Sequence, residues 1–327
     1  MISARKGVNV PGVSLSLPFI NEKDYDDLKF AVEQGFDFVA ASFTRTAEDV
    51  KELKQILREL DGEKIKVIAK IENSQGVEHL DEILQLADGV MVARGDMGVE
   101  IPLEEVPVIQ KEMIKKVYGV GKQVITATQM LDSMIQYPRP TRAEANDVAN
   151  AVYDGTSAIM LSGETAAGNY PLECVRTMVR IASRTEQDID YKKRFLQSNL
   201  PTEGSITNAI SKATVNAAME LNAKAIVTVT ESGRTAYMIS RYRPFCPVIA
   251  CTSNEQSYRQ LSLSWGVIPL LIEEKEDLDK LFEEAIRAVE KASMAETGDV
   301  IVLTAGVPIG TSGTTNLLKV HCMENQI

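Results

Sequence analysis

Three short apolar segments of the sequence each end in side chains that could do chemistry together. The segments are residues 65–71, 89–93 and 124–127, and the side chains that close them are Lys70, Glu72, Asp96 and Thr128. In parallel α/β barrels the carboxyl ends of the strands line one shared mouth, so residues far apart in sequence meet there. The sequence therefore predicts one site in which a metal ion and a phosphate are bound.

The two carboxylates Glu72 and Asp96 offer hard oxygen ligands at neighbouring strand ends. Mg²⁺ typically takes one or two carboxylates, with water and substrate oxygens completing its coordination. Lys70 faces the same side as Glu72, because side chains alternate along a strand. Positive charge from both a metal and an ammonium is what phosphoryl transfer requires. The alternatives are surface acids that cap helices and a structural Lys–Glu pair.

Gly95 and Thr128 are expected beside the carboxylates. Gly95 would let a substrate carboxylate approach the backbone, and a short helical turn at 96–97 would aim N–H groups at that anion. Gly98 is expected to lie in a tight turn between strand and loop. Thr128 would place its hydroxyl in the same mouth, either binding a carboxylate or lying on a proton path. A simple helix cap is the alternative for Thr128.

Two loops in the second half of the chain are rich in hydroxyl groups and glycine. Residues 230–235 follow one predicted strand and open a helix, and residues 310–315 form the second loop. Hydroxyls and an arginine at a helix start suit a phosphate, although two tight polar turns are the alternative. The residues predicted to hold one phosphorylated ligand are Thr230, Ser232, Gly233, Arg234, Thr235, Gly310, Ser312, Gly313 and Thr314.

The elements that must position these residues alternate between strand-like and helix-like patterns. Five strands are predicted first, at 36–43, 66–71, 89–93, 123–127 and 157–161. Four more are predicted at 225–229, 248–251, 267–272 and 300–304. The alternation predicts parallel sheets covered by helices. The segment 197–205, with Pro201 and Gly204, breaks the pattern, so we expect a domain boundary there. The second series is typical of a smaller doubly wound α/β domain.

Composition narrows the class of protein. The chain has 327 residues and a net charge of −11, which favours two domains and argues against nonspecific nucleic-acid binding. Four cysteines without CxxC spacing and two histidines argue against a zinc site and favour reduced thiols. No apolar run approaches the ~20 residues of a membrane span, and no apolar stretch of a signal peptide follows the first residues. We therefore expect a cytoplasmic protein.

Four segments closely resemble pyruvate kinase: VIAKIEN (67–73), MVARGDMGVEIP (91–102), ITATQML (125–131) and MLSGETA (160–166). The resemblance runs over essentially the whole chain, in order and with matching spacing. It implies that residues 1–196 form the C-terminal part of a TIM-type (β/α) barrel, strands four to eight. It also implies that residues 205–327 form the family's allosteric α/β domain.

The resemblance also implies a reaction and a role for each residue. Phosphate would move from phosphoenolpyruvate to ADP, giving pyruvate and ATP. Lys70 would stabilise the transferring group, while Glu72 and Asp96 would hold Mg²⁺ or Mn²⁺. Lys70, Gly95, Asp96 and Thr128 would bind phosphoenolpyruvate, with Thr128 on the path that protonates the enolate. The two hydroxyl-rich loops would hold a sugar-phosphate or nucleotide effector, and the family's usual assembly is a homotetramer.

The chain departs from the family pattern at its start. Family members begin with three further barrel strands and a lid domain, which carry the ligands of the family's K⁺ ion and an arginine that contacts phosphate. We therefore expect activity to depend on a complementing N-terminal fragment. A non-catalytic remnant that binds an effector or assembles with other subunits is the alternative. A pyruvate-forming lyase with a Glu–Asp Mg²⁺ pair is a third possibility, which the second domain and the pair Thr128-Gln129 disfavour.

Overall fold

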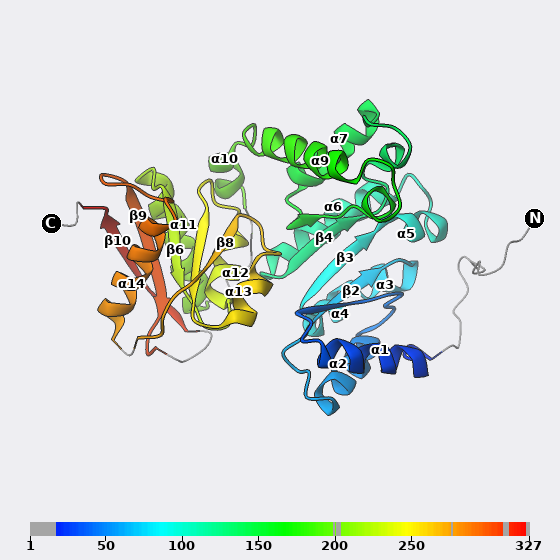
Figure 1. Cartoon of the computed structure of the whole chain (residues 1–327), viewed down its shortest axis with the longest axis horizontal. Helices are drawn as coiled ribbons and strands as arrows, with labels where there is room; N and C mark the ends of the chain where they lie inside the picture. Colours follow the sequence, from blue (N-terminus) through cyan, green and yellow to red (C-terminus); the bar gives the residue numbers. More distant parts are fainter. Residues whose placement is uncertain (1–17, 199, 201–203, 276, 310–313, 325–327) are drawn as a thin grey trace, which may run out of the picture. The chain divides into compact units, whose positions relative to one another are not determined.

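The computed structural model describes residues 18–198, 200, 204–275, 277–309 and 314–324. Contacts divide the chain into two compact units, each built on one five-stranded sheet (Figure 1). The first unit runs to Val117 and resumes over Gln123–Gln187, and the second comprises Tyr118–Lys122 and Asp188–Ile327. By these contacts the units divide ten residues before the segment 197–205.

The sheet of the first unit is entirely parallel, with its strands in sequence order. The strands are β1 (Phe38–Ala41), β2 (Lys66–Ile71), β3 (Gly89–Ala93), β4 (Gln123–Ala127) and β5 (Ala158–Ile159). Every residue of β3 and β4 is buried, as expected of central parallel strands. This order confirms the predicted barrel-type sheet, although β5 is shorter than the predicted strand 157–161.

Helices follow the strands of the first unit in the predicted alternation. They are α1 (Glu22–Glu33), α2 (Ala47–Glu59), α3 (Ser74–Glu78), α4 (Leu80–Leu86), α5 (Arg94–Glu100), α6 (Val106–Gly119), the 3₁₀ turn η1 (Asp132–Ile135), α7 (Arg142–Asp154), α8 (Gly163–Ala166) and α9 (Pro171–Glu186). A capping box at Thr141 and Glu144 starts α7, because the two side chains satisfy backbone N–H groups that the helix leaves free. Apolar side chains from α7, α9 and η1 form one core cluster.

The sheet of the second unit has the strand order β10-β9-β6-β7-β8. Its strands are β6 (Ala225–Val229), β7 (Val248–Thr252), β8 (Val267–Leu271), β9 (Val300–Gly306) and β10 (Thr315–Cys322). Its helices are α10 (Tyr191–Leu196), α11 (Ile206–Glu220), α12 (Arg234–Ser240), α13 (Glu255–Leu261) and α14 (Leu278–Lys291). Two apolar clusters cover its faces, one with α11, α12 and α13 and the other with α14. This is the predicted two-sided α/β arrangement.

Two elements of the second unit differ from prediction. Strand β10 was not predicted; it is antiparallel to β9 and lies at the sheet edge, where its mixed exposed and half-buried residues leave no continuous apolar run. The segment 172–193, whose amphipathic pattern favours one long helix, forms two, α9 at the end of the first unit and α10 in the second. The break arises at Asp190, whose carboxylate accepts a hydrogen bond from the Lys193 N–H and so starts a new helix.

Within the part of the chain that the structure describes, no helix is both long enough and apolar enough to span a bilayer.

Candidate functional site

Lys70 and Glu72 meet at the carboxyl end of β2. The Lys70 Nζ lies 2.8 Å from Glu72 Oε1 and also donates to Ser42 Oγ at 2.8 Å. The other carboxylate oxygen, Oε2, accepts the Phe43 N–H at 2.5 Å. The Glu72 side chain is 1% exposed, whereas that of Lys70 is 22% exposed. Glu72 is therefore a buried, compensated anion and not a surface acid that caps a helix.

Asp96 lies in the first turn of α5, which follows β3 directly. Strands β2 and β3 are parallel neighbours, with Ile71 level with Val92, so Glu72 and Asp96 follow adjacent strand ends. Asp96 is exposed, and within the described ranges no hydrogen bond or ion pair engages its carboxylate. No group of three possible metal ligands occurs in that part of the chain. Carboxylate oxygens are nevertheless the ligands that Mg²⁺ prefers. Asp96 is open to water, whereas the buried Glu72 would first have to release Lys70.

Gly95 and Thr128 are in direct contact, although they are 33 residues apart. The Gly95 N–H donates to Thr128 Oγ1 at 2.8 Å, and this hydroxyl donates to the Ala127 carbonyl at 2.6 Å. Both predicted site residues are thus brought together, and Thr128 is not a helix cap. The expected helical turn at 96–97 is confirmed as part of α5, but Gly98 was wrongly predicted to form a tight turn, because it lies within that helix.

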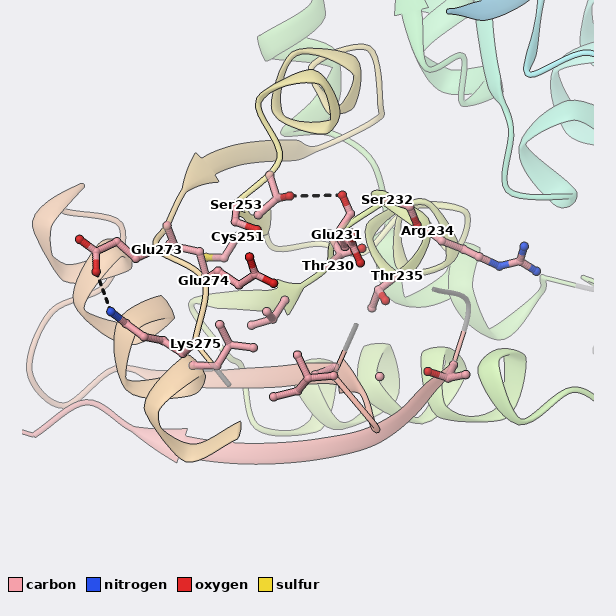
Figure 2. Close-up of a pocket in the computed structure, with 18 residues that line it drawn as sticks. Thr230, Glu231, Ser232, Arg234, Thr235, Cys251, Ser253, Glu273, Glu274 and Lys275 are labelled. Atoms are coloured by element: carbon pink, nitrogen blue, oxygen red, sulfur yellow. Dashed lines mark hydrogen bonds and ion pairs between the residues drawn. The ribbon is translucent and has the colours of Figure 1, made fainter. Parts of the chain in front are cut away.

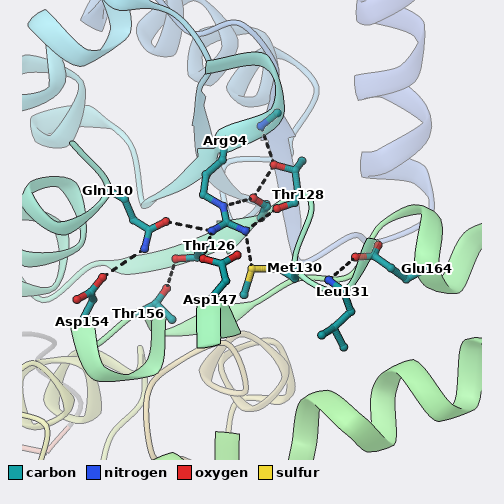
Figure 3. A network of polar contacts seen from close by, with 12 residues as sticks. Arg94, Gln110, Thr126, Thr128, Met130, Leu131, Asp147, Asp154, Thr156 and Glu164 are labelled. Carbon is teal, nitrogen blue, oxygen red and sulfur yellow. Dashed lines mark hydrogen bonds and ion pairs between the residues drawn. The ribbon is translucent and has the colours of Figure 1, made fainter. Parts of the chain in front are cut away.

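Arg94 makes contacts that the sequence did not predict (Figure 3). Its guanidinium donates to the carbonyls of Ala127 at 3.1 Å and Thr128 at 2.6 Å. It also forms an ion pair with Asp147 at 2.6 Å. The side chain is 11% exposed. The only sequence signal was a cation directly before Gly95 at a strand end.

The predicted ligand loop 230–235 lines a pocket of the second unit (Figure 2). Of the residues predicted to hold a phosphorylated ligand, the pocket contains Thr230, Ser232, Arg234, Thr235 and Thr314. Gly233 has φ +78° and caps the start of α12. Gly310, Ser312 and Gly313 lie outside the described residues.

Some pocket side chains are already engaged or point elsewhere. The Thr235 hydroxyl shares a 2.8 Å hydrogen bond with that of Thr315. The Arg234 side chain extends away from the other labelled residues in Figure 2. A guanidinium that binds a ligand here would therefore have to turn inward.

The pocket also has acidic residues that the sequence did not assign to it. Glu231, Glu273 and Glu274 line it together with Lys275. Lys275 forms an ion pair with Glu273 at 2.6 Å. This hydrogen bond and charge lower the pKa of Glu273 and raise the pKa of Lys275. The pocket thus combines hydroxyls, one arginine, a neutralised ion pair and two further carboxylates, those of Glu231 and Glu274.

Comparisons with known proteins agree with the resemblance seen in the sequence. The family model for the pyruvate kinase barrel domain matches residues 1–175, and that for the pyruvate kinase alpha/beta domain matches residues 208–321. The chain is 53% identical to a pyruvate kinase of Sporosarcina psychrophila over 320 residues, covering 98% of this chain and 55% of that protein. It is 52% identical to a pyruvate kinase of Geobacillus stearothermophilus over 325 residues, covering 99% and 55%.

A shorter relative is matched over a larger share of its length. The chain is 49% identical to a pyruvate kinase of Clostridium acetobutylicum over 324 residues, covering 99% of this chain and 68% of that protein. By contrast, the chain spans only 55% of the length of each of the first two relatives.

Proposed function

Because the chain belongs to the pyruvate kinase family, we propose that its first unit provides the site for phosphoryl transfer from phosphoenolpyruvate to ADP. The products are pyruvate and ATP. The observation that carries the proposal is the buried Glu72 carboxylate paired with the Lys70 ammonium at the end of β2. Such a pair places a carboxylate that could hold a metal beside a cation, and phosphoryl transfer uses positive charge from both.

Lys70 neutralises the transferring group. In the structure its ammonium is bound to Glu72 Oε1 and Ser42 Oγ. The partly exposed Lys70 can turn toward a phosphoryl oxygen, which leaves Glu72 free to act as a ligand together with Asp96. The ion held by these two carboxylates, Mg²⁺ or Mn²⁺, supplies positive charge that stabilises the transferring oxygens. The K⁺ ion of the family is assigned to no residue of this chain.

Gly95 and Thr128 bind and protonate the enol half of the substrate. The Gly95 N–H, now bonded to Thr128 Oγ1, can donate to the substrate carboxylate instead. The Thr128 hydroxyl is then released beside the same group, where it binds substrate and lies on the path that delivers a proton to the enolate carbon. This assigns Lys70 and Thr128 as catalytic residues and Gly95 and Asp96 as substrate-binding residues.

The second unit binds a phosphorylated effector, a sugar phosphate or a nucleotide, in the pocket of Figure 2. Support comes from the five predicted loop residues that line it and from the affinity of helix starts and arginine for phosphate. The active assembly is a cytoplasmic homo-oligomer, the family tetramer, or a complex with a complementing fragment.

A coupled assay for pyruvate tests the proposal. The chain is assayed with phosphoenolpyruvate, ADP, Mg²⁺ and K⁺, both alone and with the segment of the Geobacillus stearothermophilus relative that lies outside the matched region. We expect the unsubstituted chain to turn over in at least one arrangement. The Lys70→Met variant should be inactive there, whereas Lys51→Met, which replaces an exposed lysine, should remain active. A stable complex without turnover in either arrangement would contradict the proposal and favour a non-catalytic remnant.

A further inference from the structure

We propose that Arg94 is a positioning residue that fixes the Thr128 hydroxyl against the Gly95 N–H. The catalytic part of this inference rests on the proposed function. The structural part, which concerns how Arg94 holds the turn after β4, stands on contacts alone.

The turn after β4 has an unfavourable backbone conformation. Thr128 has φ +67° and Gln129 has φ +54°, so two consecutive non-glycine residues adopt the left-handed region. Each such residue costs about 1–3 kcal/mol, and a β-branched threonine is among the least tolerant of it. The conformation therefore persists only where surrounding contacts outweigh that cost.

Arg94 supplies such contacts to three atoms of the turn. Its Nε donates to Ala127 O at 3.1 Å, and its Nη2 donates to Thr128 O at 2.6 Å and contacts Met130 Sδ at 2.8 Å. The guanidinium thus holds the backbone on both sides of the Thr128 Cα. Arginine can do this because its donors are fixed in one planar fork, whereas lysine donates from a single atom.

The guanidinium is itself anchored from its other edge. Nη1 donates to Asp147 Oδ1 at 2.6 Å and to Gln110 Oε1 at 3.4 Å. Gln110 in turn donates to Asp154 Oδ2 at 3.3 Å, and Asp154 is paired with Lys111. Helices α6 and α7 therefore hold Arg94 in place, as the chain of dashed lines in Figure 3 illustrates.

Neighbouring residues in the sequence thus fix two parts of one threonine. The Arg94 side chain binds the Thr128 carbonyl, while the Gly95 N–H binds the Thr128 hydroxyl. If the guanidinium is lost, the turn can relax to an ordinary backbone conformation, and the hydroxyl leaves the Gly95 N–H. In the proposed reaction, that hydroxyl binds substrate and passes the proton, so its displacement lowers turnover.

The test compares Arg94→Lys, which keeps the charge but loses the fork, with Arg176→Lys, an exposed arginine, as the matched control. The first readout is the amide resonance of Gly95 in the whole chain labelled with ¹⁵N-glycine. We expect Arg94→Lys to shift this resonance and to speed its exchange with solvent about tenfold or more, while the control leaves it unchanged. This readout needs no activity.

The second readout is a double-mutant cycle in kcat with Thr128→Ala, measured in the active assembly. Arg94→Lys is expected to lower kcat about 10- to 100-fold when Thr128 is present, as for other small displacements of a reacting group. It should change kcat little when Thr128→Ala is already in place. A merely structural role would instead lower stability and give additive effects on kcat.

An unchanged Gly95 resonance, or additive effects in the cycle, would overturn the inference. If the unsubstituted chain makes no pyruvate in any arrangement, the proposed function fails, and the Gly95 resonance alone still decides how Arg94 acts. If Arg94→Lys does not fold, Asp147→Asn replaces it, because it loosens the guanidinium without removing it. The same shift of the Gly95 resonance is then expected, and its absence counts against the proposal.

Discussion

Lys70 Nζ lies 2.8 Å from Oε1 of Glu72, and the Glu72 side chain is almost completely buried. Burying a charge is costly unless it is paired. The second oxygen of Glu72 is bonded to the Phe43 N–H. Among the described residues, the Lys70 ammonium is therefore the only positive charge that this carboxylate contacts. Lys70 therefore has two functions, one in folding and one in the proposed chemistry.

Lys70→Met should abolish phosphoryl transfer and leave Mg²⁺ binding largely intact. It should also destabilise the chain by about 3 kcal/mol, since removing one partner of a buried pair leaves the other uncompensated. Added Mg²⁺ should raise the Tm of this variant more than that of the unsubstituted chain, because the ion replaces the lost positive charge. Thermal unfolding with and without Mg²⁺ measures the difference. Equal responses of the two proteins would remove Glu72 from the metal site.

Glu144→Gln should destabilise the first unit in a pH-dependent way. Burial acts to raise the pKa of this carboxyl, but hydrogen bonds from Ser133 and Thr141 outweigh it, so the pKa is lowered from 4.5. A lowered pKa contributes stability above the unfolded value that is lost as the pH falls through the folded one. The free energy of unfolding in urea should be clearly lower for the variant than for the unsubstituted chain at pH 7. This difference should shrink below about pH 4.5. A deficit independent of pH would contradict the role of the charged carboxylate.

Lys66→Met should stabilise the chain at neutral pH. Burial lowers the pKa of Lys66 to about 8, although Asp88 acts in the opposite direction. Below pH 8 the folded chain bears the full cost of the buried charge, and this cost is relieved as the pH rises toward 10.5. The variant should gain up to about 3 kcal/mol at pH 7. The gain should fall toward zero near pH 10.

The measurement for Lys66 is the free energy of unfolding in urea between pH 7 and pH 10. Lys51→Met serves as the matched control, since Lys51 is an exposed lysine of the same unit. A gain for Lys66→Met that does not decline with rising pH would show that packing, and not the charge, is its cause.

Arg234→Ala should weaken effector binding by about 1.5–3 kcal/mol, the usual contribution of a hydrogen bond to a charged group. The guanidinium points away from the other labelled pocket residues in Figure 2, so the ligand is expected to draw it inward. Calorimetric titration with a sugar phosphate and a nucleoside monophosphate measures the loss. Arg259→Ala, an exposed arginine of the same unit, is the control. Unchanged affinity for every ligand that binds would place the phosphate elsewhere.

The strand ends could be predicted from the sequence because they depend on local pattern. An apolar run closed by Lys70 and Glu72 predicts both a buried strand and the face that the two side chains share. The alternation of strands and helices likewise predicts the parallel order of β1 to β5. These features need no knowledge of distant contacts.

The turn at Thr128 could not be predicted in the same way. Its left-handed conformation depends on hydrogen bonds from Arg94 to the carbonyls of Ala127 and Thr128, which lie 33 and 34 residues later in the sequence. Strand β10 was not predicted for a related reason. It forms because its backbone pairs with β9, whereas its side chains show no continuous apolar run. Both the turn at Thr128 and strand β10 depend on tertiary contacts, which a local sequence pattern does not reveal.

The Lys70–Glu72 pair has a consequence for the metal-free protein. Many small metal-dependent domains fold only with their ion bound, so removal of the ion unfolds them. Here an internal ammonium already balances the buried carboxylate. A chelator should therefore inhibit catalysis while the circular dichroism and melting temperature of the chain stay nearly the same, and restored magnesium should return activity without any refolding step.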